Sequence, residues 1–323
     1  MGLNHTLNLR QPPLEATRDG YGRGLVEVGE KNERVCVITG DLRDSTRTAA
    51  FAKKWPERFV EAGIAEQNMV GLAAGLAATG KIPFVATYAA FVPGRAYDQI
   101  RVQVAYSQAN VKLSGAHSGL GTGPDGATHQ MLEDVAMMRA LPNMVVLAPA
   151  DAEETRKAVH LAAEYVGPVY LRFGRPEAPT FTTESTPLTI GKAGIFRTGS
   201  DISIISCGSL TYLALLAAEK LESDGISAEV LHSPSIKPLD RQAILQTAVK
   251  TKRVLVCEEA ETAGGLGGAV AELLGQELPT QIGFVSVHDQ FGQSGEPGEL
   301  ARKYEVDEDA IIASARRMVG RAT

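Results

Sequence analysis

The 323-residue sequence has few cysteines, no excess of positive charge and no long apolar run. Its three cysteines, Cys36, Cys207 and Cys257, each lie in an apolar strand-like run, which indicates buried free thiols and not a disulfide framework. A formal net charge of −6 gives no basic footprint for nucleic acid. No apolar stretch is long enough to span a bilayer, so we expect no membrane partner. The first residues, MGLNHTLNLRQPP, lack the apolar core of a secretory signal, and we therefore expect a cytoplasmic protein.

Two segments of the chain alternate strand-like and helix-like patterns, which predicts an α/β fold of two doubly wound domains. The first segment has expected strands at 35–39, 84–88, 111–114, 144–148 and 169–173, with helices at 65–78, 96–105, 133–140 and 152–164. The second has expected strands at 202–207, 228–231, 253–257 and 284–287, with helices at 212–221, 241–249 and 267–274. Between them, RPEAPTFTTESTPLTIGKAG is rich in Pro, Thr and Gly and predicts a linker. We place the domains at about 12–178 and 191–323.

Glu66 stands in the first turn of an expected helix of small residues, in GIAEQNMVGLAAGLAATGKIPF. One interpretation is an acid that the helix dipole favours by about 0.3–1 kcal/mol. The helix is too apolar for a surface element, however, and a carboxyl group buried at its start needs a specific partner. The sequence therefore leaves a structural acid and a functional acid both open.

Two further segments combine glycines, aromatics and histidines. In SGAHSGLGTGPDGATHQMLED, five glycines let the backbone approach a ligand closely, and His117, Asp125 and His129 lie among them. A solvated loop and a metal site made of these three side chains are the alternatives. In FVATYAAFVPGRAYDQIRVQVAY, Tyr88 and Phe91 either stack on a flat ligand or belong to the core.

Taken together, these segments form one pattern. GIAEQNM, TYAAFVPGRAYDQIR, AHSGLGTGPDGATHQMLEDVAMMRALPNMVVLAPAD and YLRFGRPEAP, in this order and spacing, closely resemble the pyrimidine-binding domain of transketolase. The remainder, including EEAETAGGLGGAV, resembles the C-terminal domain of that family. The resemblance covers nearly the whole chain. It implies a domain that binds the pyrimidine of thiamine diphosphate, followed by a transketolase C-terminal domain.

The resemblance implies cofactor roles for four residues. Glu66 matches the catalytic glutamate that hydrogen-bonds the pyrimidine N1′ of thiamine diphosphate and shares a proton with it. Phe91 matches the ring that stacks on the pyrimidine, and Tyr88 matches the second aromatic of that pocket. Asp41 matches an aspartate near the cofactor at the boundary between chains.

The same resemblance implies a substrate site for sugar phosphates. Arg18, Ser45, His117 and Arg175 match the group that receives the phosphate, where guanidinium forks can each donate two charge-assisted hydrogen bonds. Asp125 and His129 match residues that read the sugar hydroxyls and carbonyl. His129 would also help proton transfer when the carbon–carbon bond breaks. The implied activity moves a two-carbon ketol unit from a ketose phosphate to an aldose phosphate, as in the pentose phosphate pathway.

The sequence departs from the family pattern in two places. The turn after Phe91 reads VPGRAYDQ, whereas several full-length members have no glycine before the arginine, so Arg95 receives no role. The family holds the diphosphate and Mg²⁺ with a GDG motif and a later asparagine, but here the only Gly-Asp pair, Gly40–Asp41, is followed by Leu42. The resemblance therefore implies a split transketolase. Its separate N-terminal chain would hold the diphosphate and Mg²⁺, in an assembly with two copies of each chain.

Three rival interpretations stay open. The beta subunit of a 2-oxo-acid dehydrogenase decarboxylase has the same two domains and cofactor. Its acyl donor has no phosphate or polyhydroxyl tail, so it has little use for the four side chains Arg18, Ser45, Asp125 and Arg175 acting together. A deoxyxylulose-phosphate synthase is normally one long chain. A non-catalytic assembly subunit would not need an intact set of Glu66, Phe91, His117 and His129.

Overall fold

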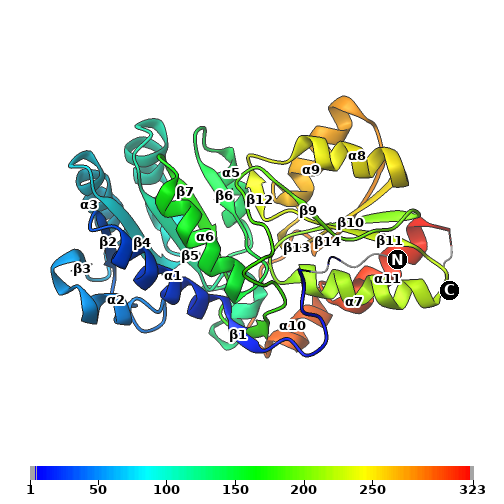
Figure 1. Ribbon diagram of the computed structural model, residues 1–323, viewed down its shortest axis with the longest axis horizontal. Coiled ribbons are helices and arrows are strands. Elements are labelled where there is room, and N and C mark those ends of the chain that lie inside the picture. The colour runs from blue at the N-terminus through cyan, green and yellow to red at the C-terminus, as the bar shows by residue number, and fades with distance from the viewer. Residues whose placement is uncertain (1–3, 5, 321–323) are drawn as a thin grey trace.

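The inner strands of the first sheet consist of buried residues. In the computed structural model, which describes residue 4 and residues 6–320 (Figure 1), β2 (Val35–Thr39), β4 (Ile82–Tyr88) and β5 (Lys112–Ala116) are buried throughout. Such continuous burial is typical of parallel strands covered on both faces. The sheet has seven strands in the order β12-β6-β7-β5-β4-β2-β3. The others are β3 (Phe59–Glu61), β6 (Val145–Leu147), β7 (Val169–Arg172) and β12 (Ser235–Lys237).

Helices cover both faces of this sheet. Neighbouring residues of a strand point to opposite faces, and here both sets of side chains are apolar and must be buried. Phe84, for example, belongs to one core cluster and Val85 to another. The Phe84 side carries α1 (Thr17–Lys31), α2 (Ala49–Lys54) and α6 (Ala152–Glu164). The Val85 side carries α3 (Glu66–Ala78), α4 (Val92–Gln99), the π-helical η2 (Ile100–Tyr106) and α5 (Asp134–Ala140). Two short 3₁₀ segments are η1 (Pro56–Arg58) and η3 (Leu120–Asp125).

A second sheet of five strands follows, in the order β14-β13-β10-β11-β9. Its strands are β9 (Gly194–Arg197), β10 (Ile202–Ser206), β11 (Ala228–His232), β13 (Arg253–Glu261) and β14 (Gln281–Val287). One face packs on α8 (Arg241–Thr251) and α9 (Leu266–Glu277), and the other on α7 (Leu210–Ser223) and α11 (Glu308–Met318). α10 (Pro297–Lys303) contacts η3 of the first half. Each sheet has helices on both faces, so the expected fold of two doubly wound α/β units is confirmed.

The two halves share one core. The cluster that contains Val85 and Met69 continues through Val146 to Ile236 and Val256 of the second half. β12, which follows β11 in the chain, leaves the second sheet and pairs antiparallel with β6 of the first. The halves are therefore joined by packing and by strand pairing as well as by the chain.

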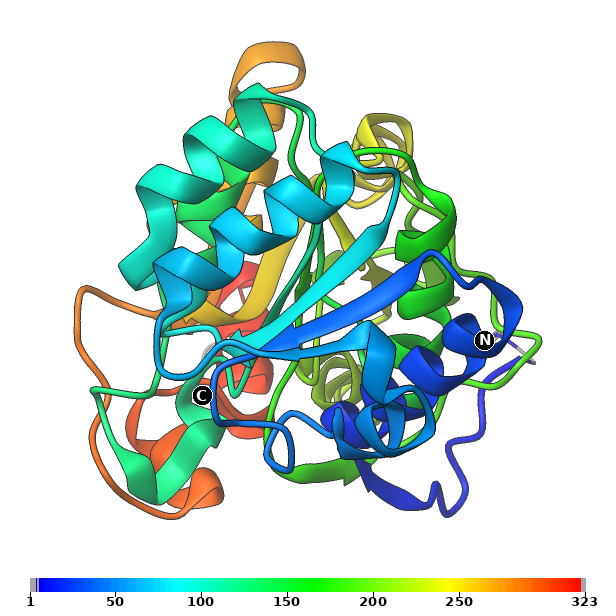
Figure 2. The same cartoon turned by 90° about the vertical axis from the view of Figure 1, so that its left-hand side faces the viewer.

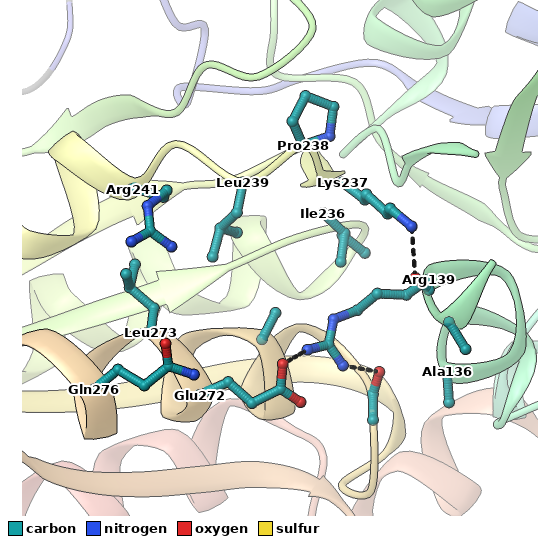
Figure 3. A pocket seen from close by; sticks show the side chains of 13 residues that line it. Ala136, Arg139, Ile236, Lys237, Pro238, Leu239, Arg241, Glu272, Leu273 and Gln276 are labelled. Atoms are coloured by element: carbon teal, nitrogen blue, oxygen red, sulfur yellow. Dashed lines mark hydrogen bonds and ion pairs between the residues drawn. The ribbon is translucent and has the colours of Figure 1, made fainter. Parts of the chain in front are cut away.

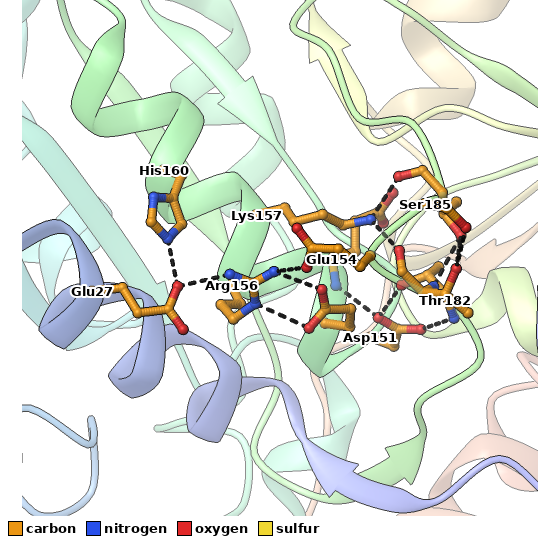
Figure 4. Close-up of polar contacts among 12 residues, drawn as sticks. Glu27, Asp151, Glu154, Arg156, Lys157, His160, Thr182 and Ser185 are labelled. Atoms are coloured by element: carbon orange, nitrogen blue, oxygen red, sulfur yellow. Dashed lines mark hydrogen bonds and ion pairs between the residues drawn. The ribbon is translucent and has the colours of Figure 1, made fainter. Parts of the chain in front are cut away.

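The segment predicted as a linker connects the halves, and strand pairing and hydrogen bonds attach it to the first half. Within it, β8 (Glu177–Pro179) pairs antiparallel with β1 (Leu14–Ala16). The Asp151 carboxylate accepts hydrogen bonds from the backbone N–H of Phe181 at 2.8 Å and of Thr182 at 2.6 Å (Figure 4). Lys157 donates to two carbonyl oxygens of the same segment. Its Pro, Thr and Gly composition thus reflects an irregular path and not a free tether.

No helix within residues 6–320 combines the length and the apolar character that crossing a membrane would require.

Candidate functional site

Glu66 is buried at the beginning of α3. Its side chain is 8% exposed, and its Oε1 lies 3.1 Å from Nη1 of Arg95. In the described part of the chain this arginine is its one ion-pair partner. Glycines let the surrounding segments approach closely: a Cβ on Gly40 would lie 2.6 Å from the Gly63 carbonyl oxygen and 2.8 Å from Sδ of Met69. These close contacts pack the start of α3 against the neighbouring backbone. The Glu66 carboxylate lies at this helix start, where the helix dipole favours its negative charge.

Four rings gather beside this carboxylate, at the ends of β4 and β5 and in the loop after β5. We name Tyr88, Phe91, His117 and His129 the ring cluster. Tyr88 stacks on His117 with centroids 4.0 Å apart and on Phe91 at 5.4 Å. The His129 ring meets Phe91 edge-on at 5.4 Å. Because β4 and β5 are parallel neighbours, their carboxyl ends bring these side chains to one edge of the sheet.

Arg95 connects Glu66 to the ring cluster. Its guanidinium lies over the Phe91 ring, 4.2 Å from the centroid, while it contacts the Glu66 carboxylate. A flat cationic group therefore occupies the space between an acid and an aromatic face. The sequence singled out this arginine only as a departure in the turn VPGRAYDQ. Its place one helical turn after Phe91 is the signal that could have identified it.

His117 is held in a left-handed backbone conformation, with φ of 54°. This conformation is uncommon for residues other than glycine, and it is often found at functional sites. The Thr122 hydroxyl fixes it by donating to the His117 carbonyl oxygen at 2.6 Å. Nδ1 of His117 is buried and, among the described residues, has no hydrogen-bond partner. A buried polar atom in this state requires a water or a ligand as its partner.

Positive charge surrounds His117. Burial, together with Arg18, Arg175 and Arg47, lowers the pKa of its imidazole to about 3, so the ring is neutral at physiological pH. Burial and the Arg47 guanidinium also lower the pKa of Arg18. Arg18 donates to the backbone carbonyl of Ser45 at 3.3 Å, and its Nε has no partner within the described chain. Arg47 pairs with Asp19 and Arg175 with Asp125, while Arg18 has no ion-pair partner in the described chain, so this group of three guanidiniums keeps an excess of positive charge that suits an anionic ligand.

Arg175 anchors the glycine-rich loop. Its Nη1 donates to the Thr122 carbonyl oxygen at 2.7 Å and lies 3.2 Å from the Asp125 carboxylate. Asp125 is therefore engaged by an arginine, which argues against its use as a metal ligand. In His129, Nδ1 pairs with the Thr128 hydroxyl at 2.8 Å. Across residue 4 and residues 6–320 the structure contains no group of three or more His, Cys, Asp or Glu side chains arranged to hold a metal.

Two of the expected site residues, Asp41 and Ser45, do not direct their side chains into contacts with the other site residues. The Asp41 side chain is exposed and forms no hydrogen bond or ion pair within the described chain; its backbone N–H donates to Glu61 at 2.7 Å. Ser45 contributes its carbonyl oxygen, not its hydroxyl, to Arg18. Arg47, which pairs with Asp19, adds charge beside His117 that sequence reasoning missed.

A wide groove of about 670 Å³ lies elsewhere, between α5, the residues after β12 and α9 (Figure 3). None of its lining residues is an expected site residue. Its cations have acceptors already: Arg139 donates to Gly264 and pairs with Glu272, and Lys237 donates to the carbonyl of Arg139. The volume of this groove is therefore not evidence that it is the functional site.

Comparisons with known proteins identify the family of both halves. Residues 15–180 match the family described as transketolase, pyrimidine binding domain, and residues 191–311 match transketolase, C-terminal domain. The "Putative transketolase C-terminal section" of Methanocaldococcus jannaschii is 45% identical over 297 residues, which cover 91% of this chain and 93% of the relative. The "6-deoxy-6-sulfo-D-fructose transketolase subunit SqwH" of Clostridium sp. is 39% identical over 304 residues, 94% of each chain.

A solved structure titled "Split gene transketolase, inactive beta4 tetramer" superposes with a TM-score of 0.89 at 43% identity. It covers 95% of this chain, which in turn spans 99% of that chain. The family expected from the sequence is thereby confirmed. The chain belongs to the transketolase family, in which it corresponds to the C-terminal subunit of a split transketolase.

Proposed function

We propose that this chain is the subunit of a thiamine-diphosphate-dependent transketolase that supplies the acid at the cofactor. The complete enzyme would move a two-carbon ketol unit from a ketose phosphate to an aldose phosphate. The observation that carries the proposal is the buried Glu66 carboxylate beside the Phe91 ring, with Arg95 between them. Pentose phosphate metabolism in the cytoplasm is the setting that we propose for this reaction.

The residues around Glu66 fit an aminopyrimidine ring. Such a ring is flat, so one face can stack on Phe91 while an edge nitrogen shares a proton with the carboxyl group. The Arg95 guanidinium is also flat and forms both contacts, at 4.2 Å from the ring centroid and 3.1 Å from the carboxylate. The Arg95 side chain is 52% exposed, so it can turn into solvent when a ligand takes its place.

When bound, thiamine diphosphate would supply the carbon nucleophile and accept the electrons of the breaking carbon–carbon bond. Glu66 would hold a proton at the pyrimidine nitrogen, and its burial keeps water away from that proton. His129, edge-on to Phe91, would take the hydroxyl proton of the donor sugar as its carbon–carbon bond breaks. His117 is neutral, so one ring nitrogen can donate to the substrate while the other accepts.

We assign the sugar phosphate to Arg18, Ser45, His117 and Arg175. Arg18 has a buried nitrogen without a partner in the described chain, and Arg175 is only partly used by Asp125. Each guanidinium can therefore offer donors to phosphate oxygens. Asp125, beside Arg175, and His129 would read the sugar hydroxyls and carbonyl. A phosphate-free acyl donor has little use for this charge, which disfavours the 2-oxo-acid dehydrogenase alternative.

We further propose that a separate N-terminal chain holds the diphosphate and Mg²⁺, with Asp41 near the boundary, in an assembly of two copies of each chain. α3 and the α4–η2 helix lie side by side with no layer over them (Figure 2). Their uncovered surface includes Leu72 and Tyr106, which are 38% and 82% exposed, and a Cβ on Gly75 would meet nothing within 4 Å. Both helices begin beside Glu66, where Gln67 donates to the Arg95 carbonyl oxygen at 3.1 Å, so apolar surface along them supports a subunit contact that extends from the site.

Reconstitution tests the proposal. The chain alone should show no transketolase activity and only weak affinity for thiamine diphosphate in calorimetry, because the diphosphate carries most of the charge to be neutralised. Addition of an N-terminal transketolase chain should restore turnover in a screen of phosphorylated ketose donors and aldose acceptors. Micromolar, Mg²⁺-dependent cofactor binding by the isolated chain would contradict the split site. An active enzyme that sediments as a one-to-one heterodimer would contradict the proposed stoichiometry.

A further inference from the structure

The glycine-rich loop that carries the expected substrate residues rests on the second half of the molecule. Glu259, in β13, accepts a hydrogen bond from the backbone N–H of Gly121 at 2.6 Å. The other oxygen of its carboxylate faces the Ser209 hydroxyl at 3.3 Å. A Cβ on Gly119 would lie 2.6 Å from the same carboxylate, so the loop backbone approaches Glu259 as closely as only a glycine allows.

The C-terminal end of the same loop also contacts the second half, through the side chain of Gln130. Nε2 of Gln130 lies 2.9 Å from the Gln293 carbonyl oxygen in the second half, and 3.2 Å from the carbonyl oxygens of Leu120 and Gly123. One amide group therefore ties two turns of the loop to the segment that follows β14. At Gly126, a Cβ would lie 2.6 Å from the Ser294 hydroxyl, so this contact is also close.

The residues expected to bind the substrate lie in the sequence close to these two contacts. His117 lies just before the turn that Glu259 holds, and Asp125 and His129 lie between that turn and Gln130. The loop is built from glycines and a 3₁₀ segment, and it has little regular backbone pairing of its own to fix its shape. The neighbouring Glu258 does different work, because its carboxylate accepts the N–H groups of Leu266 and Gly267 at the start of α9.

We propose that Glu259 is a positioning residue for the sugar substrate, which fixes the loop 117–130 from the C-terminal half so that Asp125 and His129 face the donor. This inference rests on the proposed function, since it assigns a sugar phosphate to the loop. It gives the stretch EEAETAGG a role beyond packing. The C-terminal half then contributes to substrate affinity without contacting the substrate.

Glu259→Asp tests the proposal in the reconstituted two-chain enzyme. The shorter side chain keeps the charge but withdraws the carboxylate from the Gly121 N–H. We expect KM for phosphorylated donors to rise about tenfold, with kcat within about threefold of the wild type, because binding geometry is lost and the chemistry is not. Glu259→Gln should restore wild-type KM, since its amide oxygen still accepts from Gly121 and its amide group still meets Ser209. Ser209→Ala is the matched control, and it should leave KM unchanged.

Hydrogen–deuterium exchange separates this inference from the proposed function, because it needs no turnover. In the folded chain, the backbone N–H groups of residues 118–123, 125 and 126 should exchange at least tenfold faster in Glu259→Asp than in the wild type, Glu259→Gln or Ser209→Ala. Gln130→Met, which cuts the link to Gln293, should accelerate the same amides and serves if the first variant does not fold. Unchanged exchange in both variants overturns the positioning role, as does faster exchange with unchanged KM. A wild-type enzyme without transketolase activity would overturn the proposed function and leave the exchange result to decide whether Glu259 holds the loop.

Discussion

Each half of the molecule buries a glutamate carboxylate beside the start of a helix of small residues, and the two carboxylates have different partners. Glu66 is the first residue of α3, whereas Glu258 lies in β13 and its side chain reaches the start of α9. In the second half, Glu258 accepts the N–H groups of Leu266 and Gly267 at 2.7 Å each, so both of its oxygens are engaged by α9. In the first half, Glu66 faces a half-exposed arginine side chain. Burial raises the pKa of Glu258 to about 6, against the effect of these hydrogen bonds. We therefore propose a functional role for Glu66, whose partner Arg95 is exposed enough to be displaced, and a structural role for Glu258.

Glu66→Gln should have the largest effect. The amide keeps the size of the carboxyl group but cannot share an acidic proton with a bound pyrimidine, so turnover of the reconstituted enzyme should fall by about 10²–10⁴-fold. Sedimentation should show that assembly is intact. Glu258→Gln is the matched control: it should lose about 1–3 kcal/mol of stability, because one N–H then faces an amide group, yet it should keep turnover. Near-normal turnover of Glu66→Gln would reduce Glu66 to a helix-terminal acid like Glu258.

Arg175→Ala should act on affinity more than on chemistry. Loss of a charge-assisted bond to phosphate should raise KM for phosphorylated donors by about tenfold or more, on the order of 1.5–3 kcal/mol. Erythrulose and hydroxypyruvate, which have no phosphate, should be much less affected. Arg253→Ala provides the second-half comparison, because in the described chain the hydrogen bond of its guanidinium goes to the Asp201 carbonyl oxygen and to no expected site residue. An equal penalty for both kinds of donor would remove Arg175 from the phosphate site.

His117→Gln should change the pH dependence of stability. The folded pKa of His117 is about 3, below its ordinary value of 6.5, so the unfolded chain binds this proton first as the pH falls. Wild-type stability should therefore decline by about 1.4 kcal/mol per pH unit below pH 6.5 on account of this residue. Denaturant titrations between pH 7.5 and pH 5 should show a shallower decline in the variant. His288→Gln, at an exposed position of the second half, is the control, and an identical slope in His117→Gln and the wild type would contradict the assignment.

Arg95→Ala should have the smallest effect. If Arg95 must leave the Phe91 face to admit the cofactor, its removal should tighten thiamine diphosphate binding, by less than about tenfold for a half-exposed ion pair. Calorimetry on the reconstituted enzyme measures this directly. Weaker binding would mean that Arg95 supports the cofactor instead of yielding to it.

Much of the architecture could be predicted from the sequence, because buried parallel strands are continuous apolar runs. The expected strand at 35–39 coincides with β2, and the others overlap their observed counterparts. Helix α1 was not predicted, since four glycines lower its intrinsic helix propensity. The structure explains them: a Cβ on Gly20 would lie 1.9 Å from the Ala152 carbonyl oxygen, and one on Gly24 would lie 2.8 Å from Val159. Close packing on α6 therefore overrides local preference.

The sequence alone could suggest those residues of the candidate site that lie in a local motif, and not those that only the fold brings there. Glu66, Phe91 and His117 lie in recognisable segments, and the structure brings them to one edge of the sheet. The sequence did not point to Arg95 or to Glu259, because their contacts with Glu66 and Gly121 span 29 and 138 residues of sequence. No periodicity or composition encodes such a contact. Residues that position others are for this reason harder to find than residues that bind.

The shared core has a mechanical consequence. One cluster runs from Met69 to Val256, and β12 is paired with β6, so both packing and strand pairing cross between the halves. We therefore expect the halves to unfold together, and differential scanning calorimetry should show one cooperative transition. Two separated transitions would disprove this. With the halves packed in this way, we expect access to Glu66 to depend on side-chain motion at Arg95 and on the proposed contact with a partner chain, not on the closing of one half over the other.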